Sequence, residues 1–130
     1  MRSESEVQQR VQIEAAKHGV VLMRNNSGQM VGLEGRSVRF GLGNISAKHS
    51  EHSKSSDLIG ISTIVITSDM VGKKIGVFTA IEVKTEDWND GKKLDKRETA
   101  QLNFIQWVRE RGGIAGFVNS VDSFIHLLKK

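Results

Sequence analysis

The fold of this chain is decided by the stretch Ile75-Gly76-Val77-Phe78-Thr79-Ala80-Ile81-Glu82-Val83-Lys84. Its apolar and β-branched residues favour a strand, in which successive side chains alternate between the two faces of a sheet. Glu82 and Lys84 therefore lie side by side at the end of an apolar strand. A carboxylate and an ammonium placed there suit a metal site with a neighbouring group that handles a proton or positions water. The alternative is a salt bridge at a strand end, because a single Glu-x-Lys is a weak motif.

A second apolar strand is expected just before this one, over 58–67, with a turn at 68–74 between them. The two strands predict a β-hairpin. In such a hairpin Lys84 returns toward Asp57, which directly precedes the first strand, so Asp57 and Glu82 converge. Carboxylate oxygens are hard ligands suited to Mg²⁺ or Mn²⁺. A lone aspartate at this place is otherwise a turn former or a cap.

The remaining pattern alternates helices and strands, which predicts a mixed α/β fold. With 130 residues, the chain has the size of one domain, residues 1–130. Ser3 and Glu6 have the spacing of a capping box. The other expected elements are helices over 4–18 and 96–111, a last helix capped by Ser120, strands at 20–23, 30–31, 37–40 and 114–118, and a turn at 24–29.

Residues 41–56 are rich in Gly, Ser, His and Lys, and predict a mobile loop. The run His49-Ser50-Glu51-His52 has metal-ligand residue types, but a solvated loop is the favoured interpretation. Lys48 and Lys54 add positive charge to this loop, and we expect them to let it close on a polyanion such as nucleic acid.

Composition excludes several classes of site. There is no cysteine and no tyrosine, so disulfides, thiolate metal sites and nucleophiles of either type are ruled out. No apolar run approaches the roughly 20 residues of a membrane span, and the N-terminus has no signal-peptide pattern, so we expect a cytoplasmic protein without a membrane partner. Nineteen basic against 15 acidic residues, a net charge of +4, favour a polyanionic partner such as nucleic acid.

Two polar side chains are expected on inward helix faces. Glu14 shares the face of Val7 and Val11, where a carboxylate is costly unless it is paired or bound to a cation. The alternative is an edge position that reaches water. Gln101 shares the face of Ile105 and is either functional or hydrogen-bonded to backbone.

A basic cluster separates the strand 75–84 from the helix 96–111. We expect it to grip a backbone phosphate, the alternative being a solvated face. Trp88 either stacks on a base or, as favoured here, packs over the loop. The cluster consists of Lys92, Lys93, Lys96 and Arg97.

Together these motifs resemble the virus-type replication-repair nuclease (VRR-NUC) domain of the PD-(D/E)XK nuclease superfamily. The resemblance runs over nearly the whole chain and is least clear between Asn25 and Ser55; Ser56 stands where the family often has proline. The matching segments are Ser56-Asp57-Leu58-Ile59-Gly60, Thr79-Ala80-Ile81-Glu82-Val83-Lys84, Gln101-Leu102-Asn103-Phe104-Ile105 and Gly112-Gly113-Ile114-Ala115-Gly116-Phe117-Val118.

The resemblance implies a restriction-endonuclease-like core, a mixed central sheet flanked by helices. It implies that Asp57, Glu82 and the Val83 carbonyl bind Mg²⁺ or Mn²⁺, with Glu14 beside the metal. Lys84 would orient or deprotonate the attacking water. Gln101 would lie near Lys84 as a supporting or substrate contact.

The implied activity is that of a metal-dependent endonuclease that hydrolyses phosphodiester bonds in DNA, including branched DNA of the Holliday-junction kind, with a role in DNA repair. The resemblance also implies a homodimer, in the cytoplasm of a bacterium and encoded by the host or a phage. A non-catalytic nucleic-acid-binding module that keeps the nuclease fold is the alternative. A third interpretation is a basic interaction protein with a chance motif.

Overall fold

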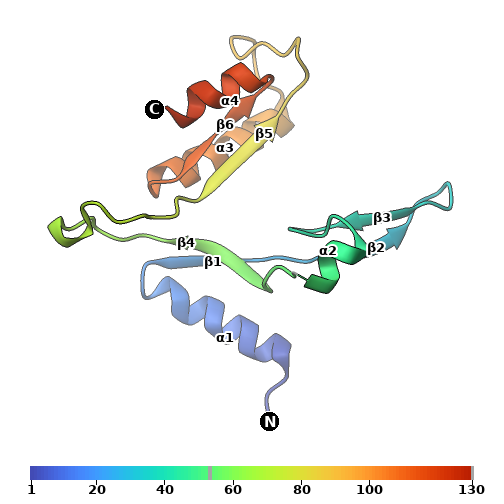
Figure 1. The fold of residues 1–130 in the computed structure, drawn as a ribbon, viewed down its shortest axis with the longest axis vertical. Helices are drawn as coiled ribbons and strands as arrows, with labels where there is room; N and C mark the ends of the chain where they lie inside the picture. Colours follow the sequence, from blue (N-terminus) through green and yellow to red (C-terminus); the bar gives the residue numbers. More distant parts are fainter. Residues whose placement is uncertain (53, 130) are drawn as a thin grey trace. The chain divides into compact units, whose positions relative to one another are not determined.

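The computed structural model describes residues 1–52 and 54–129; Ser53, within the predicted loop, and Lys130 lie outside the described residues. The chain forms two compact units, Met1–Ser62 (unit 1) and Thr63–Lys130 (unit 2), and each is described by itself (Figure 1). Both contain helices and strands, which confirms a mixed α/β protein. The single domain stays a prediction. Among the described residues, no helix has the length and apolar character needed to cross a membrane.

Unit 1 is built on the helix α1 (Glu4–Ala16) and an antiparallel strand pair, β1 (Val20–Arg24) with β4 (Leu58–Ser62). The predicted capping box is present, since Ser3 Oγ accepts from the Glu6 amide and Glu6 accepts from the Ser3 amide. Gly19, with φ of 71°, turns the chain from the helix into β1. The register runs from Val20 opposite Ser62 to Arg24 opposite Leu58.

Unit 1 also contains a hairpin of β2 (Gly28–Val31) and β3 (Ser37–Phe40), close to the predicted strands. The predicted loop 41–56 needs a correction, because it contains the short helix α2 (Ala47–His52). Ser46 Oγ accepts a hydrogen bond from the amide of His49 at 3.1 Å. Serine is typical of loops because its hydroxyl forms hydrogen bonds with nearby backbone groups. The same hydrogen bonding makes serine a good N-cap of a helix.

Unit 2 pairs β5 (Thr79–Val83) in parallel with β6 (Ile114–Val118), and α3 (Lys96–Glu110) connects them. A short turn of helix, η1 (Ser68–Met70), precedes β5, and α4 (Val121–Leu128) follows β6. The N-caps of the two helices are Asp95 and the predicted Ser120. The core of the unit lies between α3 and β6 and consists of Ile105, Val108, Ala115 and Val118.

The predicted hairpin of the strands 58–67 and 75–84 is wrong, and both strands are shorter than predicted. β4 ends at Ser62 because its partner β1 begins opposite, at Val20. β5 spans Thr79–Val83 because its partner β6 has five residues. Isoleucine and valine favour the strand state, but a strand extends only as far as a partner supplies hydrogen bonds.

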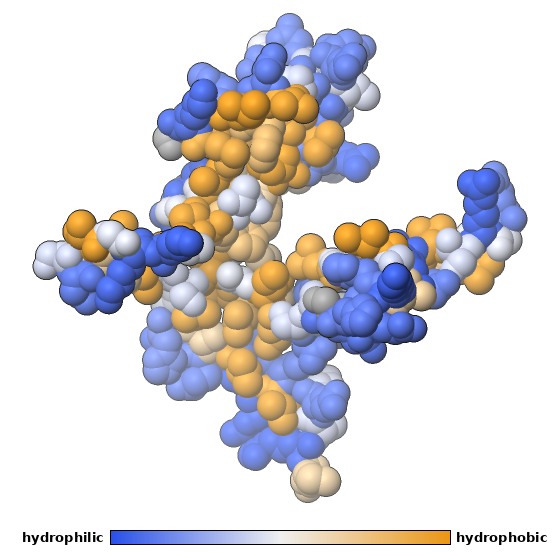
Figure 2. All heavy atoms as spheres, in the orientation of Figure 1, coloured by the Kyte–Doolittle hydropathy of each residue, from blue (hydrophilic) through white to orange (hydrophobic). Residues whose placement is uncertain are grey.

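Apolar side chains remain exposed in both units (Figure 2). In unit 1, the expected inward stripe of α1 is nearly half exposed at Val7 and Val11. In unit 2, α4 presents Val121 and Ile125 to solvent. Two-stranded sheets cover few side chains, so each unit keeps apolar surface that a larger sheet or a partner would bury.

Candidate active site in unit 2

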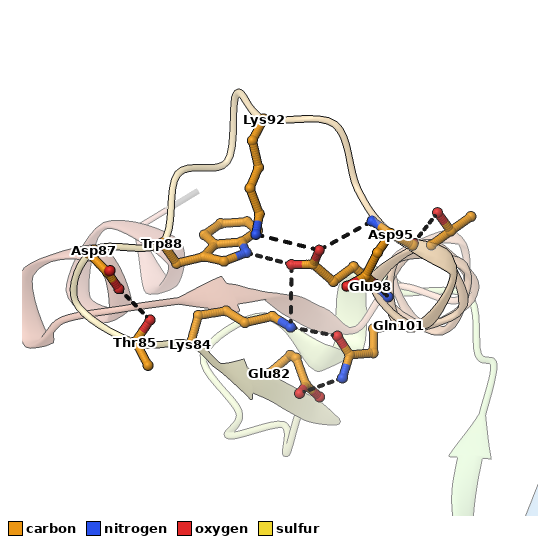
Figure 3. Close-up of polar contacts among 10 residues, drawn as sticks. Glu82, Lys84, Thr85, Asp87, Trp88, Lys92, Asp95, Glu98 and Gln101 are labelled. Carbon is orange, nitrogen blue, oxygen red and sulfur yellow. Dashed lines mark hydrogen bonds and ion pairs between the residues drawn. The ribbon is translucent and has the colours of Figure 1, made fainter.

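Three of the predicted site residues meet in unit 2, where Gln101 on α3 lies between Glu82 and Lys84 of the β5 strand end (Figure 3). Gln101 Oε1 accepts a hydrogen bond from Lys84 Nζ at 2.8 Å, and Gln101 Nε2 donates one to Glu82 Oε1 at 2.8 Å. A lysine only donates and a carboxylate only accepts, so one orientation of the amide satisfies both. Gln101 therefore lies beside Lys84, as expected, and its role there stays a prediction.

Local sequence explains this meeting. Glu82 and Lys84 are two residues apart in an extended segment, so they share a face. The backbone amide of Lys84 continues the parallel pairing by donating to Val118 at 2.8 Å. On α3, Ile105 and Val108 are buried, and Gln101 lies one and two turns before them on the same helix face.

A fourth residue, Glu98, joins the group and is the one buried charged side chain of the described residues, 5% exposed. Its Oε2 accepts from the indole nitrogen of Trp88 at 2.6 Å and lies 3.6 Å from Lys84 Nζ. Its Oε1 accepts from the amide of Asp95 at 3.2 Å and lies 3.6 Å from Lys92 Nζ. Every contact of this carboxylate is therefore with a donor or a cation, as a buried charge requires.

These donors also set the electrostatics of Glu98. The indole hydrogen bond from Trp88, followed by the Asp95 amide, lowers the pKa of Glu98 to about 2, against the opposing effect of burial; Lys92 and Lys84 act in the same direction. In the loop between β5 and α3, a hydrogen bond from the Thr85 hydroxyl lowers the pKa of Asp87. Glu98 is thus a fixed negative charge beside Lys84 at neutral pH.

The loop between β5 and α3 is held against β6. The rings of Trp88 and Phe117 lie 4.9 Å apart, and Asn119 Nδ2 donates to the carbonyls of Glu86 and Trp88 at 3.2 and 3.1 Å. Trp88 therefore packs against Phe117 of β6 and donates to Glu98 of α3, which agrees with the favoured interpretation, a packing role. Lys84 Nζ lies 5.3 Å from the centre of the Phe117 ring, and its side chain is 15% exposed.

An open cavity of about 390 Å³ borders the group and is lined by Glu82, Gln101, Arg97 and Phe104, among others. Arg97 is thus the member of the predicted basic cluster that shares a cavity with Glu82. Lys93 and Lys96 are exposed, and Lys92 faces Glu98 while 48% of its side chain stays exposed. Cation and carboxylate side chains therefore occur together at this cavity.

Three other predicted site residues, Asp57, Lys54 and Glu14, belong to unit 1. Asp57 lies directly before β4, as predicted, and is exposed; its backbone carbonyl accepts from the Asn25 amide at 2.9 Å. Asn25 Nδ2 also donates to the Ser56 carbonyl and to Ser55 Oγ, which ties this segment to the end of β1. Lys54 lines a cavity of about 290 Å³ with Arg39.

Glu14 departs from its expected inward placement. Its side chain is 60% exposed, forms an ion pair with Lys17 at 3.3 Å and contacts the His18 imidazole at 3.3 Å, three and four residues further along the chain. These local partners match the alternative interpretation, an edge position that reaches water. A part in metal binding stays a prediction for this residue.

Glu82 has the ligand chemistry that a hard divalent cation takes. Gln101 is the hydrogen-bond partner of one Glu82 oxygen, and a carboxylate has further lone pairs for a cation. Val83 is the exposed residue between Glu82 and Lys84. Within residues 1–52 and 54–129, no cluster of three or more acidic or histidine side chains suited to a metal ion is formed, so a site shared by Asp57 and Glu82 stays a prediction.

Sequence reasoning missed Glu98, although a signal for it exists. The run Asp95-Lys96-Arg97-Glu98 has the acceptor-x-x-Glu spacing of a capping box at the start of a helix. The box is formed, with Glu98 donating its amide to Asp95 Oδ1 at 2.7 Å. The spacing predicts the cap but not the contact with Lys84, which depends on β5.

Comparison of the chain with protein-family models, curated proteins and solved structures gave no match. The VRR-NUC resemblance therefore rests on the motifs quoted above.

Proposed function

We propose that the protein is a divalent-metal-dependent endonuclease that hydrolyses phosphodiester bonds in DNA. The observation that carries the proposal is the hydrogen-bonded group of Glu82, Gln101 and Lys84, of which Glu82 and Gln101 line a cavity together with Arg97. A salt bridge at a strand end needs no glutamine between its partners. The interposed amide instead holds a carboxylate and an ammonium apart while it orients both.

In this proposal Asp57 and Glu82 hold Mg²⁺ or Mn²⁺, with the Val83 carbonyl as a further ligand and Glu14 nearby. The bound cation supplies Lewis-acid stabilisation of the charge that develops on the phosphoryl oxygens. Lys84 Nζ has three N–H groups. Gln101 accepts one, Glu98 lies beside a second, and the third donates to the attacking water or the phosphate.

Binding of the DNA backbone falls to basic side chains. Arg97 shares the cavity with Glu82, so it is the first candidate for a phosphate contact. Lys92, Lys93 and Lys96 extend this charge along the same segment. Lys54 supplies a cation in unit 1.

We further propose a restriction-endonuclease-like core of the VRR-NUC type. Its support is the order of elements around the site: a strand that carries Glu82 and Lys84, a helix that carries Gln101, and a parallel strand after it. The expected substrates include branched DNA. The proposed setting is the bacterial cytoplasm, which the resemblance alone supports.

The decisive experiment is a cleavage assay on linear, flapped and four-way DNA. Cleavage is expected with Mg²⁺ or Mn²⁺ and should stop with EDTA. Asp57→Asn, Glu82→Gln and Lys84→Ala should each reduce the rate at least 100-fold while circular dichroism shows an unchanged fold, because each removes a group that contacts metal or water.

Glu110→Gln is the matched control, because it removes an exposed carboxylate from the same helix that carries Gln101. Cleavage that persists in chelator would reject the metal mechanism. Binding of DNA without cleavage in both metals would favour the non-catalytic module instead.

A homodimer is the proposed assembly. α4 exposes an apolar stripe of the kind that subunit interfaces bury. Light scattering is expected to give about twice the chain mass of 14.4 kDa, and Ile125→Asp to give the monomer mass. A wild-type protein that scatters as a monomer at micromolar concentration would contradict the assembly. The stripe consists of Val121, Phe124, Ile125 and Leu128.

A further inference from the structure

We propose that Glu98 is a positioning residue for the site, which fixes Lys84 against Gln101 and couples that lysine to the start of α3 and to the preceding loop. The inference rests on the proposed nuclease function for its kinetic consequence. Its structural part, a carboxylate that restrains Lys84, stands without it.

The first support is that the two oxygens of Glu98 contact different partners. Oε2 faces Trp88 Nε1 at 2.6 Å and Lys84 Nζ at 3.6 Å, whereas Oε1 faces the Asp95 amide at 3.2 Å and Lys92 Nζ at 3.6 Å. All four partners are donors, so both oxygens must be acceptors. Glutamine has one such oxygen, and its amide group would point at donors on whichever side it took.

The second support is that Glu98 is held independently of Lys84. The capping box with Asp95 fixes its backbone and one oxygen at the helix start, and the Trp88 indole fixes the other (Figure 3). A residue already held from two sides can orient a third partner. The lysine side chain would otherwise sample many rotamers.

The third support is the geometry around the Lys84 ammonium. Gln101 Oε1, Glu98 Oε2 and the Phe117 ring surround it at 2.8, 3.6 and 5.3 Å. Each attracts a cation, the ring through its negative face. Gln101 also contacts Glu82, so removing Glu98 leaves Lys84 with one polar partner, which is shared with the proposed metal ligand.

The test combines two measurements on the full chain. Selective ¹⁵N labelling of lysine allows NMR detection of the Lys84 ammonium group, whose signal is visible only when its motion and proton exchange are restrained. Cleavage kinetics with Mn²⁺ give kcat and KM. The variants are Glu98→Gln, Trp88→Phe, Lys84→Ala to assign the signal, and Glu110→Gln as control.

Glu98→Gln is expected to abolish the Lys84 signal and to lower kcat at least tenfold, with KM within twofold of the wild type. A purely structural role would instead change the fraction of active protein and leave the remaining signal intact. Trp88→Phe keeps the carboxylate and removes one of its anchors, so a smaller loss in the same direction is expected. If Glu98→Gln fails to fold, the Trp88→Phe variant tests the role of Glu98 instead.

A Lys84 signal as sharp in Glu98→Gln as in the wild type, or a kcat within twofold, would overturn the inference while the nuclease function stands. An inactive wild type that still loses the signal in Glu98→Gln would sink the proposed function and leave the restraint on Lys84 supported. Glu110→Gln should match the wild type in both measurements.

Discussion

Gln101 and Glu98 both contact Lys84, and each has a different effect on it. The amide of Gln101 spans an acceptor and a donor, so it sets the spacing between Glu82 and Lys84. Glu98 supplies the negative charge that a poorly exposed ammonium needs nearby. The candidate site is therefore defined less by the Glu-x-Lys motif than by the two α3 side chains that contact it.

The acid stability of the protein is expected to depend on Glu98. Its pKa is lowered from an ordinary value of 4.5 to about 2 in the folded protein, so its ionised contacts stabilise the fold fully above pH 4.5. This contribution is lost as the pH falls toward 2. Thermal unfolding should show the wild type more stable than Glu98→Gln at pH 6, with a gap that shrinks between pH 4.5 and 2.5.

A gap of constant size from pH 6 to pH 2.5 would show that the lowered pKa does not contribute to stability. At pH 6, Glu110→Gln controls for the loss of a carboxylate from α3. It should unfold within about 0.5 kcal/mol of the wild type, as expected for an exposed position.

At the scale of elements, the glycine of the Ser56–Gly60 motif has a structural reason. Gly60 in β4 lies against β1, where a Cβ atom would overlap the carbonyl oxygen of Val21. The strands could not keep their register with any larger residue. The same motif places Asp57 directly before β4, so the pairing of β4 determines where that carboxylate stands.

Gly60→Ala is expected to destabilise the β1–β4 pair by about 1–3 kcal/mol, the usual cost of forcing a methyl group into a packed contact. Amide hydrogen exchange in β1 and β4 should accelerate, and chemical denaturation should give the free energy. Gly76→Ala is the control, because a Cβ there meets nothing within 4 Å. Unchanged exchange in both strands of the Gly60 variant would contradict this account.

At the scale of the whole molecule, the two proposed metal ligands, Asp57 and Glu82, lie 25 positions apart in the sequence. In the proposed nuclease both carboxylates bind the same cation. The proposal thus predicts that one metal ion affects the signals of both residues.

Mn²⁺ provides the measurement, because it broadens NMR signals of nearby nuclei. We expect the amide signals around Asp57 and around Glu82 to lose intensity at the same Mn²⁺ concentration. Glu82→Gln should weaken the effect at both places, since it removes a shared ligand. Broadening around one carboxylate alone would refute the shared metal site.

Most elements could be predicted from local sequence. The Ser3–Glu6 box, the Ser120 cap and the apolar run Ile114–Val118 were all located correctly. Such motifs involve residues only a few positions apart, so they can be recognised in the sequence without knowledge of the fold. Gln101 was placed correctly for the same reason, because helical periodicity sets its face.

Sequence alone therefore indicated most of the helices and strands, and it placed Glu82 and Lys84 on one face of a strand and Gln101 on the inward face of a helix. Only the tertiary structure decided that β4 pairs with β1 and β5 with β6, which removed the predicted hairpin and shortened both strands. It also decided that Glu98 is buried against Trp88 and Lys84. Strand pairing and burial depend on residues that are distant in the sequence. The local strand propensity of a segment does not identify which distant segment it pairs with.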